Sequence, residues 1–372
     1  MRQKRKSKVF IFTSVHPWND VRIFYKQAIS LSKEYSVEIH APATFAHKTL
    51  RGINIYGLPI WTKKSDRIKT SWLLLKRILR SPADVFHFHD PELIILGLLI
   101  KLFGLGKVIY DIHENNNQLI RERLWIPSYL RVPLLVFNSF MERLAIACFD
   151  KIIIAEDSYM SFIHGQPEII HNYPLPNSRS SKQEKSIDAI YLGGVMEERG
   201  IFELLAIARE VIKEYPMFKM KIIGPIAENI EGKIRQLTDR WNLQNSLTLT
   251  GRMDYESAME ELSHAKIGLV ILHPIKNYTQ SLPTKIFEYM SYGIPYLATN
   301  IPYWMRFFKG DQAGYFVNNE DIKYAASKIV ELLNNHELRT NLGEKGKSLV
   351  KMKYGWSAEE KILLSLYQKL EY

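Results

Sequence analysis

Short apolar runs alternate with segments of helical periodicity along most of the chain. In the first half, we interpret the apolar runs as buried strands, at residues 9–14, 37–40, 85–89, 108–111 and 152–154. Apolar residues recurring every three or four positions predict helices, at residues 20–32, 73–79, 93–103 and 133–149. Alternation of strand and helix at this spacing predicts a parallel sheet with helices on both faces.

A polar stretch at residues 174–185, PLPNSRSSKQEK, interrupts this alternation and predicts an interdomain linker, because it has almost nothing to bury. Beyond it the alternation restarts, with strands predicted at residues 189–192, 220–223, 247–250, 267–272 and 296–299. Helices are predicted at residues 201–214, 230–241, 255–265, 282–290, 319–334, 336–350 and 357–370. The fold class is therefore α/β, with two doubly wound parallel-sheet domains, residues 1–173 and 187–352, and a cleft between them.

The segment QSLPTKIFEYM, residues 280–290, carries the strongest functional signal. It follows a predicted strand, and Pro283 suits the first turn of a helix, where its missing N–H costs nothing. The free N–H groups of that turn, the helix dipole and Lys285 together predict an anion site, with phosphate as the expected anion. Glu288 lies about one turn further on among apolar residues, where a charge needs a partner. Its carboxylate suits the two hydroxyls of a ribose.

Composition limits the compartment and the kind of site. The 372 residues suffice for two domains of ordinary size. The single cysteine, Cys148, excludes a disulfide framework and a zinc site built from several cysteines, and it fits a reducing cytoplasm. No uncharged stretch reaches the roughly 18–20 residues of a membrane span. We therefore expect a cytoplasmic protein.

The positive charge is concentrated in the first half of the chain. Residues 1–180 hold 25 Lys/Arg against 15 Asp/Glu, whereas residues 181–372 hold 25 against 24. A basic domain suits nucleic acid or an acidic membrane surface, unless its charge serves only solubility. No nucleic-acid motif accompanies the charge, so we expect no nucleic-acid partner. The apolar residues 124–148, with Arg121, Arg123 and Arg131 nearby, form either a core helix or a helix that lies on a membrane surface.

Polar residues follow several predicted strands of the first half. Ligands of open parallel sheets bind beyond the carboxyl ends of the strands, so these residues are candidates for a ligand site in the cleft. They are His16, Asp20, His89, Asp90, His113 and Glu114.

Structural roles compete with these assignments. Asp20 suits the N-cap of the following helix, and His89 with Asp90 either lines the cleft or caps the next helix. His87 and His89 share a strand face, but a metal site needs a further ligand, and no Asp-x-Asp element is present. We therefore expect no metal and no cofactor.

The segment 280–290 resembles the donor-binding signature of the family-4 retaining glycosyltransferases, which have the GT-B fold. That signature holds two glutamates separated by seven intervening residues; Glu288 matches the second, and Gln280 stands in place of the first. The resemblance implies that Glu288 binds the ribose of a nucleotide and that Gln280 contacts the transferred sugar. It also implies that the backbone of Leu282, Pro283 and Thr284 binds the diphosphate.

Other segments share this resemblance. Gly193 and Gly194 correspond to a family glycine loop in which an arginine often follows the first glycine, and Arg199 corresponds to a later cation on the diphosphate. Lys285 or Arg252 would supply the missing positive charge, and Gly224 begins a loop near the nucleotide base. His113 corresponds to a histidine that reaches the donor sugar, and it can donate or accept a hydrogen bond when neutral. The helix at 357–372 would pack back on the first domain.

The resemblance implies a metal-independent, hexosyltransferase-like enzyme of surface polysaccharide synthesis. It would move a sugar from a nucleotide diphosphate sugar to a glycan or lipid-linked acceptor and retain the anomeric configuration. It would work in the cytoplasm or at the inner face of a membrane. His113, Gln280, Arg199 and Lys285 are the expected catalytic residues. Two alternatives stay open: a nucleotide-sugar epimerase of the same fold, and a non-catalytic subunit that binds a nucleotide sugar, which Gln280 and Gly194 favour.

Overall fold

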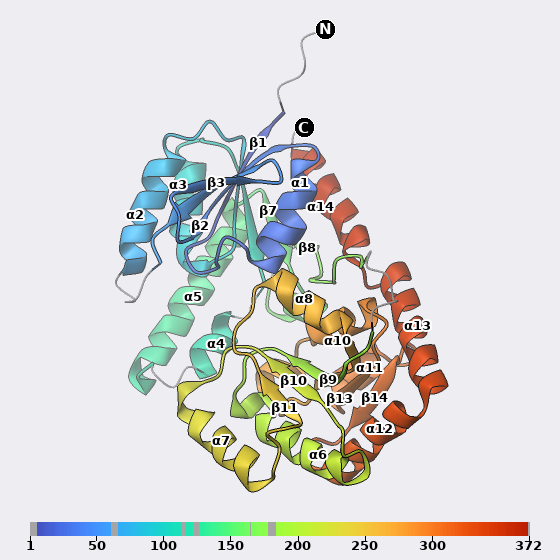
Figure 1. The fold of residues 1–372 in the computed structure, drawn as a ribbon. Helices are drawn as coiled ribbons and strands as arrows, with labels where there is room; N and C mark the ends of the chain where they lie inside the picture. Colours follow the sequence, from blue (N-terminus) through green and yellow to red (C-terminus); the bar gives the residue numbers. More distant parts are fainter. Residues whose placement is uncertain are drawn as a thin grey trace. The chain divides into compact units, whose positions relative to one another are not determined.

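The computed structural model describes residues 6–60, 66–113, 116–122, 126–163, 165–177 and 184–370 (Figure 1). The chain divides into two compact units, the first from Met1–Asn172 with Ala358–Tyr372 and the second from Tyr173–Ser357. Each unit holds a sheet of mostly or entirely parallel strands covered by helices on both faces. The predicted fold class, two doubly wound α/β domains, is therefore confirmed.

The first sheet has the strand order β3–β4–β2–β1–β5–β6–β7–β8, and all neighbours are parallel except β3 and β4. The chain reverses its direction of winding between β1 and β5, which are neighbours in the sheet. In an open sheet this switch point is where ligands bind. The strands are β1 (Lys8–Phe12), β2 (Ser36–Pro42), β3 (His47–Leu50), β4 (Ile53–Leu58), β5 (Val85–Phe88), β6 (Lys107–Ile112), β7 (Lys151–Ile154) and β8 (Glu168–Ile169).

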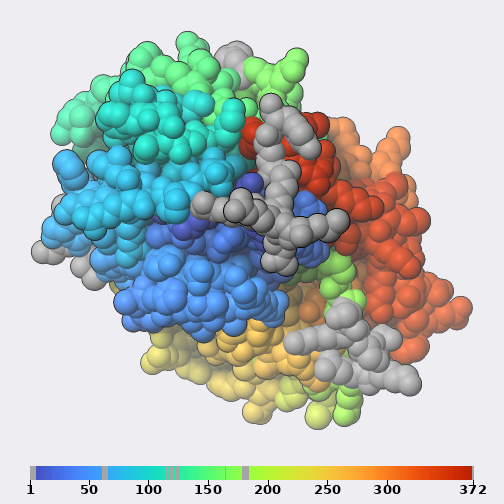
Figure 2. Space-filling view, turned by 90° about the horizontal axis from the view of Figure 1, so that it is seen from above, coloured from blue at the N-terminus to red at the C-terminus, as the bar shows by residue number. Residues whose placement is uncertain are grey.

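Side chains of the first sheet alternate between an aromatic face and a polar face. Phe86 and Phe88 pack under α2 (Asp66–Ile78), α3 (Ile94–Leu102) and α5 (Ser128–Cys148). His87 points the other way, and its Nδ1 lies 2.7 Å from the hydroxyl of Tyr367 on α14 (Trp356–Leu370). The π-helix η1 (Val21–Ala28) and α1 (Ile29–Ser32) lie on the same side of the sheet as α14, whereas α2, α3 and α5 lie on the opposite side (Figures 1 and 2).

The second sheet is entirely parallel, with the order β11–β10–β9–β12–β13–β14. Its strands are β9 (Ile187–Leu192), β10 (Met220–Ile223), β11 (Leu247–Leu249), β12 (Ala265–Val270), β13 (Tyr296–Thr299) and β14 (Gly314–Val317). One core lies under α6 (Ile201–Glu214), α7 (Glu231–Arg240) and α12 (Ile322–Asn334). A second core lies under α8 (Tyr255–Ser263), α10 (Thr284–Ser291) and α11 (Pro302–Phe307), and α13 (His336–Met352) packs on α10.

Short elements complete the two units. They are α4 (Asn116–Glu122), α9 (Lys276–Thr279) and the 3-10 turns η2 (Pro91–Leu93), η3 (Asp157–Ser161), η4 (Glu197–Arg199) and η5 (Glu228–Ile230). Among the described residues, no helix combines the length and the apolar character that crossing a bilayer requires.

Several local features differ from the prediction. Strands β3, β4, β8 and β14 were not predicted. β3 is a polar edge strand, HKTL, with no apolar face to bury. The helix expected to start at Pro133 begins at Ser128 instead, so Pro133 lies inside α5. Its missing N–H leaves the carbonyl of Tyr129 without a helical partner, which is tolerable because both residues are exposed and water can reach them.

Gly268 on β12 determines how closely α10 approaches the second sheet. A Cβ atom at Gly268 would lie 2.2 Å from the ring of Tyr289 on α10. The Tyr289 hydroxyl accepts a hydrogen bond from the Leu192 N–H at 3.2 Å and donates to the Leu269 carbonyl at 3.2 Å. Both bonds lie near the carboxyl ends of β9 and β12, so Tyr289 fixes α10 at the edge where ligands of such sheets bind.

We predict that Gly268→Ala lowers the free energy of unfolding by on the order of 2 kcal/mol, because the methyl group overlaps the Tyr289 ring. Gly232→Ala is the matched control, since nothing lies within 4 Å of a Cβ atom there. It should be neutral or stabilise the protein by about 0.5 kcal/mol, since alanine favours the helix. Urea unfolding followed by circular dichroism measures both. Equal stability of the two variants would contradict the close packing.

Candidate functional site

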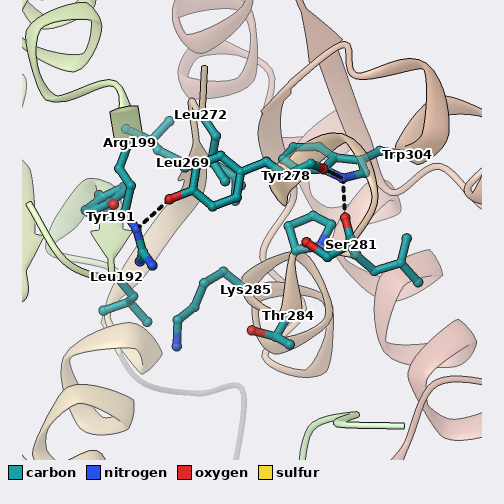
Figure 3. Close-up of a pocket in the computed structure, with 13 residues that line it drawn as sticks. Tyr191, Leu192, Arg199, Leu269, Leu272, Tyr278, Ser281, Thr284, Lys285 and Trp304 are labelled. Atoms are coloured by element: carbon teal, nitrogen blue, oxygen red, sulfur yellow. Dashed lines mark hydrogen bonds between the residues drawn. The ribbon is translucent and has the colours of Figure 1, made fainter. Parts of the chain in front are cut away.

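A pocket in the second unit lies at the carboxyl ends of β9 and β12 (Figure 3). Tyr191 and Leu192 contribute from β9, and the segment from Tyr278 to Lys285 contributes most of the opposite wall. Arg199 reaches into it from the end of η4. The pocket therefore brings Arg199, which follows the glycine loop, together with the segment 280–290, which the sequence singled out separately.

The N-terminus of α10 forms part of this pocket. The helix begins at Thr284 with Pro283 in the N-cap position, and it ends at Ser291 ahead of Gly293, whose φ is 66°. Pro283, Thr284 and Lys285 all line the pocket. N–H groups of a first helical turn have no partner within their helix, and they carry the positive end of its dipole. The arrangement has the chemistry of an anion site.

Trp304 holds the loop that precedes α10. Its indole Nε1 donates to the Ser281 carbonyl at 2.7 Å and to the Tyr278 carbonyl at 3.1 Å. The Ser281 hydroxyl donates to the Asn277 carbonyl at 2.9 Å. These bonds fix the loop without a ligand, so little ordering is needed when one binds.

Arg199 lies across the glycine loop after β9. A Cβ atom at Gly193 would approach the Arg199 Nη1 to 3.1 Å, and one at Gly224 would lie 1.7 Å from the Gly193 carbonyl oxygen. These glycines therefore leave room for the guanidinium and for each other. The Arg199 Nε donates to the Tyr278 hydroxyl at 3.1 Å. In the part of the chain that the structure describes, no carboxylate lies within ion-pair distance of Arg199.

Glu288 has a partner on its own helix. The Lys285 Nζ lies 2.8 Å from the Glu288 Oε2, and Glu288 is only 8 % exposed. The sequence predicted that a carboxylate in this apolar helix needs a partner, and Lys285 is that partner in the structure. Lys285 therefore lies between the pocket and a buried carboxylate.

Some expected donor residues lie outside the pocket. Gln280 and Arg252 are exposed, and neither lines it, because Gln280 follows α9 on its outer side and Arg252 belongs to a separate loop. Gly194 contacts Met196 rather than the guanidinium, since its Cβ position lies 4.0 Å from the Arg199 Nη1. Conversely, sequence reasoning missed Tyr191, Tyr278 and Trp304. Aromatic residues next to apolar runs look like core residues, so no local signal distinguished them.

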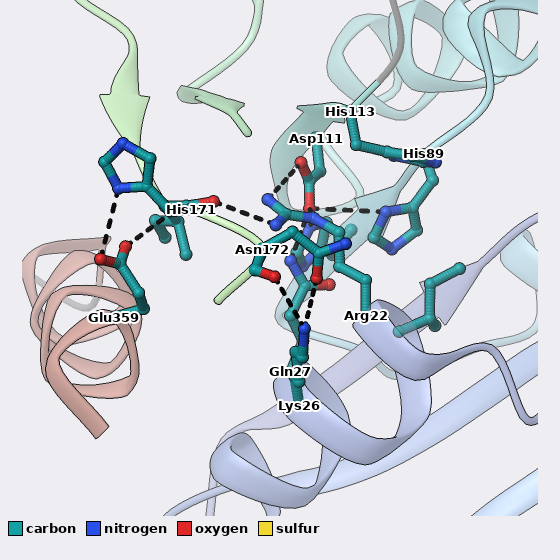
Figure 4. Close-up of polar contacts among 12 residues, drawn as sticks. Arg22, Lys26, Gln27, His89, Asp111, His113, His171, Asn172 and Glu359 are labelled. Atoms are coloured by element: carbon teal, nitrogen blue, oxygen red, sulfur yellow. Dashed lines mark hydrogen bonds and ion pairs between the residues drawn. The ribbon is translucent and has the colours of Figure 1, made fainter. Parts of the chain in front are cut away.

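The first unit holds a second polar site, centred on Asp111 at the end of β6 (Figure 4). The Arg22 guanidinium donates from Nε and Nη2 to the two Asp111 oxygens, each at 2.9 Å, and Gln27 donates to the same carboxylate. Burial alone would raise the pKa of Asp111, but the Arg22 charge holds it well below its usual range. Arg22 is itself buried, so this ion pair is a permanent part of the core.

Residues that the sequence predicted as cleft residues meet beside this ion pair. The Nε2 atoms of His16 and His113 lie 3.0 Å apart, and the His16 Nε2 lies 3.4 Å from the Asp90 Oδ1. Burial first, and the nearby His16 second, lower the pKa of His113. One imidazole of the pair must donate and the other accept, so at most one of them carries an added proton. Glu114 lies outside the described residues.

Asp20 and Asp90 take structural roles of different kinds. Asp20 is an N-cap, since its side chain accepts from the N–H groups of Arg22 and Ile23 at 2.9 and 3.0 Å. Asp90 precedes η2 but makes no side-chain cap there, so the expectation that it caps the next helix is wrong. Its Oδ2 instead accepts from the Thr13 hydroxyl at 2.7 Å and the Ser14 N–H at 2.6 Å. It therefore ties the loop after β1 to the end of β5.

Three buried residues on the polar face have the composition of a metal site. Ligand atoms of His87, His89 and Asp111 all lie within 4.8 Å of one another, so Asp111 is the further ligand that the sequence did not supply. However, both Asp111 oxygens already accept bonds from Arg22, and the guanidinium charge opposes a cation. These residues therefore fit a metal ion poorly.

Comparison with known protein families adds an independent observation. The family described as "Glycosyl transferases group 1" matches residues 177–349, which include the whole pocket. The matched residues make up most of the second unit. The two halves of the predicted donor site, the glycine loop and α10, both lie within the matched residues.

The relatives of this chain are distant. An uncharacterized glycosyltransferase of Haemophilus influenzae is 24 % identical over 185 residues, which is 50 % of this chain and 49 % of that protein. The chain spans between about half and three-fifths of the length of the curated relatives it matches. Sucrose-phosphate synthase from Thermosynechococcus elongatus superposes with a TM-score of 0.72 at 13 % identity over 98 % of this chain and 99 % of that one. Anabaena HepE, solved in complex with UDP, gives 0.67 at 12 % identity over 98 % and 100 %. The fold that accompanies the group 1 domain is GT-B.

The buried histidines predict how stability depends on pH. Burial lowers the pKa of His87 from 6.5 to about 4. Below pH 6.5 the unfolded chain therefore takes up a proton that native His87 does not, and stability falls with pH. We predict that His87 costs about 2 kcal/mol between pH 7 and pH 5. The variant His87→Gln should lose correspondingly less stability over this interval.

Chemical unfolding at both pH values measures the effect, and the difference between parent and variant cancels contributions of other titrating groups. His47→Gln is the control, since His47 is exposed. The same pH dependence in the parent and in His87→Gln would contradict a neutral, buried His87.

Proposed function

We propose that this protein is a retaining glycosyltransferase that moves a sugar from a nucleotide diphosphate sugar to a glycan or lipid-linked acceptor in surface polysaccharide synthesis. The observation that carries the proposal is one pocket, within the group 1 domain, that combines Arg199, Lys285 and the N-terminus of α10. Two cations and the N-terminus of a helix around one hollow match the charge of a pyrophosphate.

The proposed donor lies with its diphosphate on this pocket and its ribose against Glu288. Lys285 is one helical turn from Glu288 and already bridges the pocket to that carboxylate. Tyr191 is a neutral donor and acceptor in the wall, because burial raises its pKa to about 12. Anabaena HepE, which shares the fold, was solved with UDP, and this supports a nucleoside diphosphate as the leaving group.

Electrostatic stabilisation of the leaving group is the proposed source of catalysis. As the bond between the sugar and the diphosphate breaks, negative charge grows on the departing phosphate oxygen. Arg199, Lys285 and the α10 amides are preorganised where that charge develops, so they stabilise the transition state more than the ground state. No metal is needed for this role. His113 is the proposed positioning residue for the sugar.

The residues that line the pocket favour attack on the same face from which the diphosphate departs. None of the lining residues is an aspartate or glutamate, so none supplies a carboxylate for a covalent intermediate. The acceptor hydroxyl itself would then be the nucleophile, with its proton passing to the leaving diphosphate. The same lack of carboxylates disfavours the epimerase alternative, which needs acids and bases at the sugar.

A non-catalytic subunit that binds a nucleotide sugar is the second candidate. The exposed Gln280, which lies outside the pocket and lacks the charge of the family glutamate, favours it. Such a subunit would bind the donor as tightly as the enzyme but would neither transfer nor hydrolyse the sugar.

We predict that Arg199→Ala weakens binding of a nucleoside diphosphate by roughly 10- to 100-fold, the value of one charge-assisted contact. Arg252→Ala is the matched control, because it removes the same charge from an exposed position outside the pocket. It should change the dissociation constant less than about twofold. Isothermal titration with UDP, GDP and ADP measures both variants. No binding of any of the three, or equal weakening by both variants, would contradict the assigned donor site.

We predict that His113→Ala lowers turnover by about 100-fold while the dissociation constant of the nucleoside diphosphate stays unchanged, since a positioning contact acts in the transition state. Product formation from radiolabelled nucleotide sugars in the presence of lipid-linked acceptors measures turnover, and NMR of the product determines the anomeric configuration. If the parent and Gln280→Glu both bind donor yet neither transfers nor hydrolyses it, the protein is the binding subunit and not an enzyme. An inverted product would contradict retention.

A further inference from the structure

Helix α5 in the first unit carries its apolar side chains on the outside. Tyr129, Val132, Val136 and Phe140 follow one another at intervals of three or four residues, which places them on one face of the helix. They are 75 %, 67 %, 65 % and 60 % exposed. A surface helix of a soluble protein normally turns such a face toward the core, so α5 has the reverse arrangement.

The inner face of α5 combines core residues such as Ala145 with a cluster of polar side chains. The Asn138 amide donates to the Asn117 Oδ1 on α4 at 3.1 Å, and Asn117 in turn donates to the Glu142 carboxylate at 3.4 Å. Glu142 is buried, and burial raises its pKa. These bonds lock the orientation of the helix. The polar contacts on the inner side therefore hold the apolar face of α5 toward the solvent.

Helices α2 and α3 extend the same surface. Trp72 and Ile68 on α2 are 62 % and 65 % exposed, and Ile95 and Leu102 on α3 are exposed as well. All three helices cover one side of the first sheet, and α3 packs against both α2 and α5 (Figures 1 and 2). We call the outward sides of α2, α3 and α5 the basic apolar face. It includes Leu79 and Arg80, which follow α2, and Phe103, which follows α3. Exposed apolar groups on this scale mark an interaction surface.

The charge on this face selects the class of partner. The three helices with Arg80 hold eight Lys/Arg and two Asp/Glu, and one of the two acids is the buried Glu142. Lys69, Lys76 and Arg80 are exposed. Lys69 follows the exposed Ile68, Lys76 lies about one helical turn after the exposed Trp72, and Arg80 follows the exposed Leu79 just beyond α2. Tryptophan beside lysine and arginine, with aliphatic and aromatic residues between them, is the composition of helices that lie in a membrane interface. Anionic headgroups would neutralise the cations while the apolar side chains enter the acyl boundary.

We propose that the basic apolar face docks on the surface of an anionic lipid bilayer. A second copy of the chain fits less well, because two such faces would bring like charges together. A nucleic acid would leave the aliphatic residues of α5 without a partner. The proposed docking does not depend on the proposed transfer reaction. It would add to that function, because docking would hold the first unit at the surface where a lipid-linked acceptor is found.

Vesicle sedimentation with the full chain tests the proposal. Phosphatidylcholine vesicles are compared with vesicles that contain about 30 mol % phosphatidylglycerol, at about 0.1 M and about 1 M salt. We expect at least about fivefold more bound protein on the anionic vesicles at low salt, and a loss of most of this binding at high salt. Equal binding to neutral and anionic vesicles, or no binding to either, would overturn the proposal.

Two sets of variants separate the apolar and the charged contributions. Trp72→Ser with Phe140→Ser removes exposed apolar groups, and its control removes two equally exposed groups of the second unit, Met217→Ser with Met352→Ser. A charge-reversal set has a matched control at exposed positions of the second unit. The set is Lys69→Glu, Lys76→Glu and Arg80→Glu, and the control is Arg240→Glu, Lys309→Glu and Lys351→Glu.

Each set on the basic apolar face should reduce binding to anionic vesicles by about fivefold or more, with unchanged thermal stability, while the controls bind within about twofold of the parent. Loss of binding in a control to the same extent would overturn the assignment to this face. Light scattering after size exclusion gives a second readout. A dimer in the parent that the Trp72 and Phe140 variant dissociates would show that a second copy covers the face, and would also overturn the proposal. Because donor binding to the other unit is measured separately, failure of docking and failure of the proposed function are distinguishable.

Discussion

The contact between Tyr289 and the second sheet is the constraint on which the candidate donor site depends. The ring of Tyr289 lies against the bare backbone of Gly268, and its hydroxyl joins the ends of β9 and β12. This contact determines where the first turn of α10 lies relative to the loop that carries Arg199. Because the hydroxyl is buried and uses both donor and acceptor capacity, a shift of the helix would leave a polar group unsatisfied. The first turn of α10, which forms part of the anion pocket, is therefore positioned by core packing.

Much of the fold was predictable because its helices and strands are strongly periodic. α6, β10 and β13 have the predicted bounds, and α10 begins and ends within two residues of the prediction. The features that were missed lack periodicity. β3 is polar throughout, and the first turns of α5 have apolar residues on their exposed face, so the pattern indicated a start at Pro133. A prediction that assumes that apolar residues face the core fails for α5, because its apolar side chains face the solvent.

The candidate site was predictable only where backbone chemistry defines it. A proline before a helix and glycines after a strand are local signals, and they led to α10 and to Gly193. The tertiary contacts were not visible in the sequence, since Tyr278 lies in a loop and Trp304 in a short helix. The same holds for Arg22 and Asp111, which are 89 residues apart and form a buried ion pair. The sequence showed that the first half of the chain is basic and holds several histidines. It did not show that Asp111 neutralises the charge of Arg22.

For the proposed nucleotide donor, the Lys285–Glu288 ion pair would set the order in which parts of the molecule are recognised. While the lysine is bound to the carboxylate, the pocket presents a neutral pair to an incoming molecule. An arriving phosphate competes for the lysine, and each step of that exchange frees a carboxylate oxygen for a sugar hydroxyl. A nucleoside without phosphates has nothing to offer the lysine and must bind against an intact pair. Discrimination between a charged donor and its uncharged breakdown product would then arise from a single side-chain exchange, with no movement of the backbone.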